Sequence, residues 1–130
     1  MPEQRLVIRR PDDWHVHLRD GDMLATVAKH TAHQFGRAIV MPNLSPPITT
    51  AQQARDYRTR IMSALPTDTN FEPLLTAYLT DTMAADEIEA GFGQDVFTGP
   101  ANCIPRTSPL TPITANMSPS WVFVRLNASW

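Results

Sequence analysis

Short apolar stretches alternate with amphipathic helical stretches through the first 98 residues, and this alternation limits the possible folds more than any other feature. Strands separated by helices form parallel sheets joined by right-handed crossovers. Two architectures satisfy that pattern, a doubly wound sheet and a (β/α)₈ barrel. No G-x-G-x-x-G follows the first strand, so the usual support for a dinucleotide-binding sheet is missing.

Local patterns place the expected elements along the chain. Extended segments are predicted at residues 6–8, 14–17, 37–41 and 73–79, and a fourth main strand is predicted to begin at Val96 and Phe97. The apolar run 37–41 has the composition of a strand buried on both faces. Helices are predicted to begin with Asp22 as cap, with a capping box of Thr50 and Gln53, and with Thr82 as cap of residues 83–90. The second helix would bury Ala54, Tyr57, Ile61 and Leu65.

Composition indicates a protein of the cytoplasm. The 130 residues carry a formal net charge of -2, which favours neither nucleic acid nor an anionic membrane as partner. No apolar run approaches the roughly 20 residues of a membrane span, and residues 1–5 lack the apolar core of a signal peptide. The single cysteine, Cys103, fits a reducing compartment and has no spacing typical of a metal ligand.

Residues 12–20, with the sequence DDWHVHLRD, carry the most chemistry. Side chains alternate along a strand, so His15 and His17 should point the same way. Two neutral imidazoles from one strand end can hold a divalent metal such as zinc, although such a pair also occurs as a structural feature. Arg19 would continue on that side and offer a planar fork for a substrate carboxylate.

His15, His17 and Asn43 all follow predicted strands at their carboxyl ends. In a (β/α)₈ barrel the chemistry lies at that face, so the agreement favours the barrel over the doubly wound sheet. The chain would hold three to four βα units and therefore an incomplete barrel. His30 and His33 fall within a predicted helix and are expected on its face, without a ligand role.

Residues 5–98 resemble the N-terminal part of the bacterial dihydroorotase family of the shorter, single-function type, within the amidohydrolase superfamily. The resemblance rests on residues 9–23 (RRPDDWHVHLRDGDM) and 36–44 (GRAIVMPNL), with support from 78–81 (YLTD) and 91–92 (GF). It implies a (β/α)₈ barrel with two zinc ions, usually as a homodimer. It also implies the reversible cyclisation of N-carbamoyl-L-aspartate to L-dihydroorotate in de novo pyrimidine biosynthesis.

The resemblance assigns roles only where residues match. His15 and His17 correspond to the first two metal ligands, and Arg19 and Asn43 correspond to residues that hold the substrate carboxylate. The lysine that bridges the two zinc ions, the later histidine ligands and the catalytic aspartate have no match in this chain. The 130-residue chain is therefore expected to be inactive by itself. The alternative is a catalytically dead remnant that serves at most as a metal-binding or interaction fragment.

The resemblance stops after Thr98, and the composition changes there, since all 13 carboxylates lie before Gly99. A shifted reading frame can be tested from Gly99 onward by joining the third base of each codon to the first two bases of the next codon. This frame permits the sequence Ala-Gly-Lys-Leu-Tyr-Pro-Ala-Asn, which is similar to the family's continuation. The Leu is forced, because Asn102 followed by Cys103 gives only Leu codons. We therefore predict a domain of residues 1–98 and an unrelated, frameshifted and disordered tail over residues 99–130.

Overall fold

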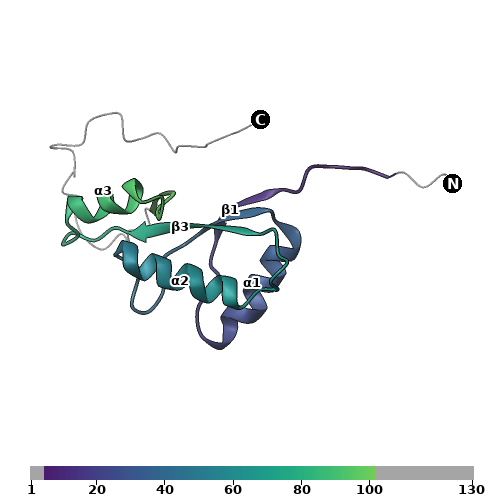
Figure 1. The fold of residues 1–130 in the computed structure, drawn as a ribbon, viewed down its shortest axis with the longest axis horizontal. Helices are drawn as coiled ribbons and strands as arrows, with labels where there is room; N and C mark the ends of the chain where they lie inside the picture. The colour runs from purple at the N-terminus through teal and green to yellow at the C-terminus, as the bar shows by residue number, and fades with distance from the viewer. Residues whose placement is uncertain (1–4, 102–130) are drawn as a thin grey trace.

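Strands and helices alternate strictly along the chain, as the sequence pattern predicts (Figure 1). The computed structural model describes residues 5–101. Its elements in chain order are β1 (Asp12–Val16), α1 (Asp22–Gln34), β2 (Arg37–Val40), α2 (Ala51–Ser63), β3 (Glu72–Tyr78), α3 (Ala85–Gly93) and β4 (Gly99–Ala101). None of the helices in this part of the chain is both long and apolar enough to span a membrane.

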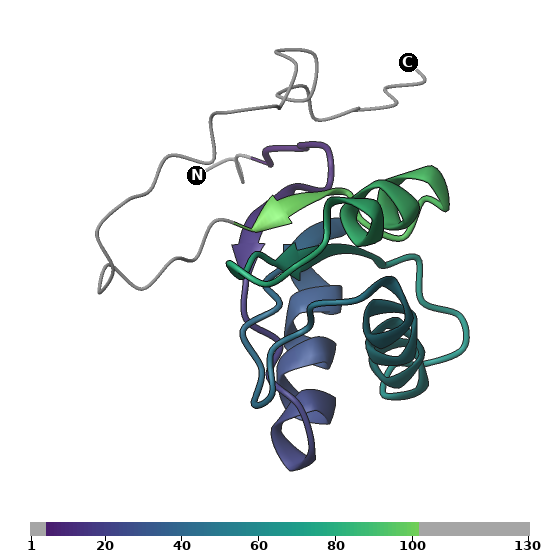
Figure 2. The same ribbon diagram turned by 90° about the vertical axis from the view of Figure 1, so that its left-hand side faces the viewer.

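The four strands form one parallel sheet in the order β1-β2-β3-β4. Each crossover moves one place in the same direction, so right-handed connections put every helix on the same face. Figure 2 shows the helices following one another along one side of the curved sheet, and α2 contacts both α1 and α3. A doubly wound sheet would carry helices on both faces. The described α/β unit is therefore consistent with a partial barrel, the fold that the sequence predicts.

The hydrophobic core lies between the sheet and its helices. Alternate residues of β2 face it, since Ala38 and Val40 are fully buried, whereas Ile39 on the other face is only half-buried. The prediction of burial on both faces therefore holds only in part, because the described residues cover the helical face of β2 fully and leave Ile39 on the other face partly exposed. The second helix buries Ala54, Tyr57, Ile61 and Leu65, as predicted.

The three helix starts differ in how far local sequence determines them. The capping box of α2 is present: Thr50 Oγ1 accepts from the Gln53 backbone N–H at 3.2 Å, and Gln53 Oε1 accepts from the Thr50 N–H at 3.2 Å. The other two predicted caps were wrong. Gly21 caps α1 and Asp22 is the first helical residue, while Ala84 precedes α3 and no side chain caps either helix. Contacts from α2 hold the turn before α1, whereas the turn before α3 has local hydrogen bonds, such as the one from the Met83 N–H to the Thr80 carbonyl.

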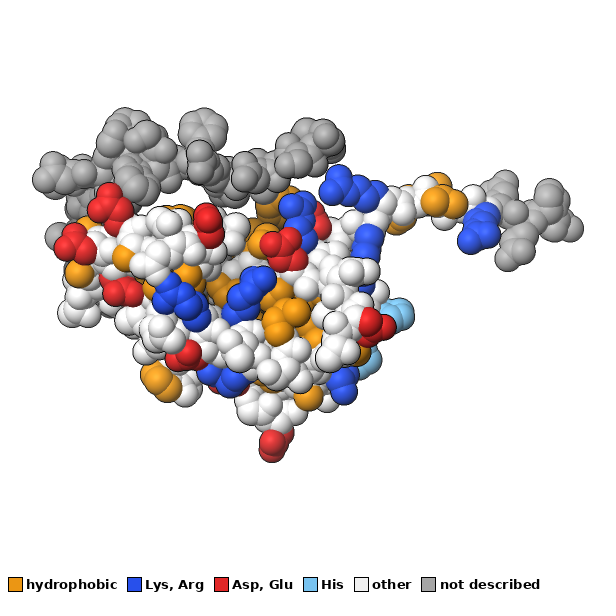
Figure 3. Space-filling model, in the orientation of Figure 1, with side chains coloured by type: hydrophobic (Ala, Val, Ile, Leu, Met, Phe, Trp, Pro, Cys, Tyr) orange, Lys and Arg blue, Asp and Glu red, His pale blue; other side chains and the backbone are white. Residues whose placement is uncertain are grey.

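The ends of the described chain also differ from the predicted strands. Residues 6–8 are not part of a strand, and Leu6, Val7 and Ile8 are 85%, 81% and 69% exposed on an arm that extends from the body (Figures 1 and 3). Along the face in Figure 3 acidic and basic side chains are interspersed. β4 begins at Gly99 rather than Val96, because Phe97 is instead buried against Gly91.

β4 therefore consists of the first three residues after the predicted boundary at residue 98, and it pairs with β3. Cys103 and the rest of the predicted out-of-frame tail, residues 102–130, lie outside the described residues. The boundary itself stays a prediction.

Candidate metal and substrate site

The two histidines of the predicted metal site come together at the carboxyl end of β1. His15 lies in β1 and His17 follows its last residue, Val16. Their Nε2 atoms are 3.2 Å apart, and the ring planes meet at 61°. The pairing of β1 with β2 is irregular between Asp13 and Val16, and the Asp13 carboxylate accepts a 2.9 Å hydrogen bond from the His15 backbone N–H. The histidine pair therefore lies where the register of β1 with β2 is interrupted.

The distance between the two imidazoles fits a tetrahedral metal ion. Two nitrogens that each lie about 2.0 to 2.1 Å from a tetrahedral zinc are separated by about 3.3 Å. The observed 3.2 Å between His15 and His17 matches that separation, and it also suits a hydrogen bond in which one ring donates. Among the described residues no group of three or more His, Cys, Asp and Glu side chains could hold a metal. By geometry alone, the pair could supply two nitrogens to a metal ion, and the described residues supply no third ligand beside them.

Electrostatics favour the ligand form of the second histidine. Burial lowers the pKa of His17, and the nearby positive charges of His15 and Arg19 lower it further. A neutral imidazole has the free lone pair that a metal requires, so both effects keep His17 ready to bind.

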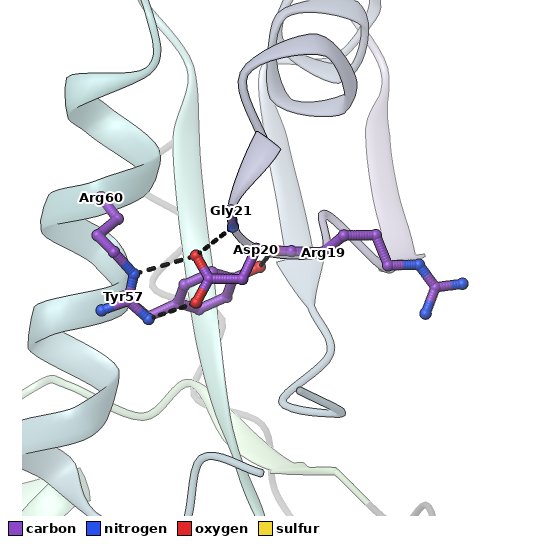
Figure 4. Close-up of polar contacts among 5 residues, drawn as sticks. All are labelled: Arg19, Asp20, Gly21, Tyr57 and Arg60. Carbon is purple, nitrogen blue, oxygen red and sulfur yellow. Dashed lines mark hydrogen bonds and ion pairs between the residues drawn. The ribbon is translucent and has the colours of Figure 1, made fainter. Parts of the chain in front are cut away.

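Arg19 lies in the turn between β1 and α1, beyond the strand that was expected to orient it. Its φ of 64° is in the left-handed region, which non-glycine residues rarely adopt. Figure 4 shows its side chain pointing away from α2, while its carbonyl faces α2 and accepts a 2.5 Å hydrogen bond from the Tyr57 hydroxyl. The turn, rather than strand alternation, therefore sets the direction of the guanidinium.

Asp20 ties the same turn to α2. Its two carboxylate oxygens accept from Arg60 Nε at 3.1 Å and Nη2 at 2.9 Å, and Oδ1 also accepts from the Gly21 N–H at 3.0 Å (Figure 4). Burial opposes ionisation of Asp20, but the hydrogen bonds from Arg60 and Gly21 outweigh it, so the pKa of Asp20 lies below its ordinary value. The carboxylate is therefore charged at neutral pH, and it accepts hydrogen bonds from both Arg60 and Gly21.

Asn43 lies in the loop after β2, at the same edge of the sheet as the end of β1. Its side-chain oxygen Oδ1 is buried and has no hydrogen-bond partner among the described residues. The loop is held locally, since the Pro42 carbonyl accepts from the backbone N–H groups of Leu44 and Ile48. Buried polar atoms are nearly always paired, so an unpaired Oδ1 at this position is unusual for the described residues.

Sequence reasoning missed the part played by α2. It treated Tyr57 as a core residue and assigned no contact to Asp20 or Arg60. Tyr57 and Arg60 reach residues 38 and 40 positions away in the chain, so no local spacing could have revealed these contacts. His30 and His33 are exposed on α1, as expected.

Comparison with known proteins gives a consistent result. The dihydroorotase of Cronobacter sakazakii is 61% identical over 109 residues, which cover 81% of this chain and 31% of that protein. The dihydroorotase of Sphingopyxis alaskensis is 67% identical over 94 residues, or 72% of this chain and 28% of that protein. The chain belongs to the dihydroorotase family, as a partial segment. It spans about three tenths of the length of these relatives. No family model matches the chain.

Solved structures of the dihydroorotase family share the fold. The Campylobacter jejuni dihydroorotase superposes with a TM-score of 0.62 at 34% identity, covering 69% of this chain and 25% of that one. The dihydroorotase of Saccharomyces cerevisiae, solved in complex with 5-fluoroorotic acid, gives a TM-score of 0.61 at 32% identity over 71% of this chain and 26% of that one. Both the sequence and the backbone therefore match members of one family.

Proposed function

We propose that this chain is the part of a dihydroorotase that supplies two metal ligands and two substrate contacts. The whole protein would interconvert N-carbamoyl-L-aspartate and L-dihydroorotate in pyrimidine biosynthesis. The observation that carries the proposal is the 3.2 Å separation of His15 and His17 Nε2 at the carboxyl end of β1, next to the turn that presents Arg19. That arrangement occurs in a chain whose relatives are named dihydroorotase.

His15 and His17 would hold the metal, and zinc suits their nitrogen donors. When bound, a metal of this kind supplies a Lewis acid for a carbonyl and lowers the pKa of water. The residues fit two ligand positions, and the remaining ligands must come from the part of the family's length that this chain does not span. The role of these two histidines is to fix the position of the ion relative to the strand end.

Arg19 and Asn43 would hold the substrate. The guanidinium of Arg19 presents parallel N–H groups that match a carboxylate, which both N-carbamoyl-L-aspartate and dihydroorotate carry. The amide nitrogen of Asn43 would donate to a substrate oxygen, and its buried Oδ1 would accept an N–H from a neighbouring group of the protein. Two such contacts at one edge of the sheet orient the substrate against the metal and so reduce the entropy cost of reaction.

We propose that the 130-residue chain is inactive by itself. The segment would function in the cytoplasm only within a longer enzyme. A chimera tests the function, with residues 5–98 of this chain replacing the aligned segment of the Cronobacter sakazakii dihydroorotase. The chimera should bind zinc and hydrolyse dihydroorotate, while the 130-residue chain should show no turnover above background. An inactive chimera that is folded and zinc-loaded would refute the proposed roles.

The second candidate is a catalytically dead remnant, and it is favoured by the absence of a third metal ligand among residues 5–101. The genomic sequence around codon 98 separates the two candidates. Restoring the frame there should open a coding region of some 200 further residues, given the usual size of a barrel. Stop codons directly after codon 98 in both other frames would favour the remnant.

A further inference from the structure

The turn that carries Arg19 is held in an unusual backbone conformation by contacts from α2. Arg19 and Gly21 have φ angles of 64° and 59°, so two of three consecutive residues are left-handed. For arginine this conformation costs on the order of 1 kcal/mol, and it persists only where the surrounding structure imposes it. Leu18, which precedes the turn, is fully buried, and this anchors the chain on one side.

Three side chains from two elements anchor the other side. The Tyr57 hydroxyl donates to the Arg19 carbonyl, and Arg60 binds both oxygens of the Asp20 carboxylate. The two α2 residues are three positions apart and so lie on one face of the helix, with the Arg60 guanidinium 5.3 Å from the centre of the Tyr57 ring. Tyr57 is fully buried, so its hydroxyl has little access to water as an alternative partner.

These contacts hold the backbone from which the Arg19 side chain extends. In Figure 4 the carbonyl of Arg19 is directed at Tyr57, and the guanidinium extends to the opposite side of the backbone. Because the carbonyl and the side chain leave the same residue, holding one limits the orientation of the other. A freed residue would relax to the more common right-handed or extended conformations, and the guanidinium would move with it.

We propose that Tyr57 and the Asp20–Arg60 ion pair are positioning residues that hold Arg19 in the orientation in which it binds the substrate carboxylate. This inference rests on the proposed function of Arg19. Tyr57 is suited to the role because burial, followed by the charge of Asp20, raises the pKa of its hydroxyl, which therefore remains a donor. None of the three positioning side chains needs to touch the substrate.

The chain offers a matched control for this network. Asp12 and Arg37 form a second two-point ion pair, with Arg37 Nε 3.1 Å from Asp12 Oδ1 and Nη2 2.5 Å from Oδ2. That pair lies at the amino ends of β1 and β2, the opposite edge of the sheet. Breaking it should affect the fold in a similar way but leave Arg19 in place.

The experiment is a double-mutant cycle in the zinc-loaded chimera. Tyr57→Phe should raise KM for dihydroorotate about fivefold, the factor expected for the loss of one ordinary hydrogen bond, with kcat and zinc content little changed. In the Arg19→Met background the same substitution should have no further effect on KM. Asp20→Asn should behave like Tyr57→Phe, and Asp12→Asn should leave KM unchanged.

The outcomes separate this inference from the proposed function. If Arg19→Met raises KM but Tyr57→Phe has no effect, or has equal effects in both backgrounds, the positioning role is refuted and the substrate contact stands. If Arg19→Met leaves KM unchanged, the substrate contact itself is refuted, and the inference falls with it.

A second measurement covers variants that fail to give active enzyme. Hydrogen–deuterium exchange of the 130-residue chain should become faster in residues 18–24 for Tyr57→Phe and faster in residues 12–16 for Asp12→Asn. Equal exchange of residues 18–24 in the two variants would overturn the positioning role.

Discussion

The two edges of the parallel sheet each carry one aspartate that is bound at two points by an arginine. One ion pair joins two strands, and the other joins a turn to a helix. At the amino edge Asp12 and Arg37 are direct partners in the pairing of β1 with β2. At the carboxyl edge Asp20 and Arg60 join a turn to a helix 40 positions further along the chain. The first pair reinforces a register that backbone hydrogen bonds already set. The second holds a turn that lies beyond the last residue of the strand.

From this difference we expect the amino ends of the strands to serve stability and the carboxyl ends to serve chemistry. In (β/α)₈ barrels the active site lies at the carboxyl ends of the strands, and the opposite face mainly supports the fold. His15, His17, Arg19 and Asn43 all lie at or beyond the carboxyl ends of β1 and β2. If the division holds in this chain, substitutions at the carboxyl edge should alter metal or substrate binding, and those at the amino edge should alter stability.

The largest expected effect is at His15 and His17, the two proposed metal ligands. His15→Ala in the chimera should remove zinc and activity together, because one of two converging nitrogens is lost. Metal analysis and dihydroorotate hydrolysis measure both quantities on the same sample. His30→Ala is the control, since His30 is exposed on α1, and it should retain both. A His15→Ala protein that keeps zinc and activity would contradict the proposed metal site at the carboxyl end of β1.

Arg19→Met should have the next largest effect, and it should act on substrate alone. Loss of a charge-assisted contact of about 1.5 to 3 kcal/mol predicts a fall in kcat/KM of at least about tenfold. Zinc content should stay near normal. Lys29→Met removes the same charge from the exposed surface of α1 and should leave kcat/KM unchanged. Loss of zinc from Arg19→Met would mean that the turn supports the metal rather than the substrate.

Gly91→Ala tests the amino edge, where α3 turns into β4. A Cβ at Gly91 would lie 2.0 Å from Cδ2 of the buried Phe97 ring, so ring or helix must move. Overpacking of this kind costs about 1 to 3 kcal/mol in the free energy of unfolding, which thermal or urea unfolding of the chimera would measure. Gly93→Ala, in the same helix, meets no atom within 4 Å and should not destabilise. KM should be unchanged in both variants.

The smallest effect is expected for Asp12→Asn. This partly exposed ion pair should contribute at most about 1 kcal/mol to the free energy of unfolding at neutral pH. The hydrogen bond from Arg37 lowers the pKa of Asp12 in the folded state. Its contribution is therefore present above the unfolded value of about 3.9 and lost as the pH falls through the lower folded value.

Asp12→Asn should accordingly show a weaker dependence of unfolding free energy on pH below about 4 than the parent chimera does. Chemical unfolding followed across that pH range provides the measurement. Asp68→Asn, at an exposed site, is the matched control. An unchanged pH dependence in Asp12→Asn would show that the pair adds nothing to the register of β1 and β2.

Much of the architecture was determined by the sequence alone. Alternating apolar and amphipathic runs predicted the parallel α/β arrangement, and Thr50 with Gln53 predicted the start of α2. These features depend on side chains close together in the chain, where spacing carries the information. The two-residue spacing of His15 and His17 likewise predicted that their imidazoles converge on one side of the strand end.

Tertiary structure decided the features that depend on distant residues. The capping of α1 by Gly21, the left-handed Arg19 and the unpaired Oδ1 of Asn43 follow from how β1, α2 and the loop after β2 pack together. β4 begins after Phe97 because burial of that ring against Gly91 takes precedence over its strand propensity. Local pattern placed Arg19 just after His15 and His17, whereas Tyr57 and Arg60, far along the chain, bind the turn that carries Arg19, since only packing brings their side chains there.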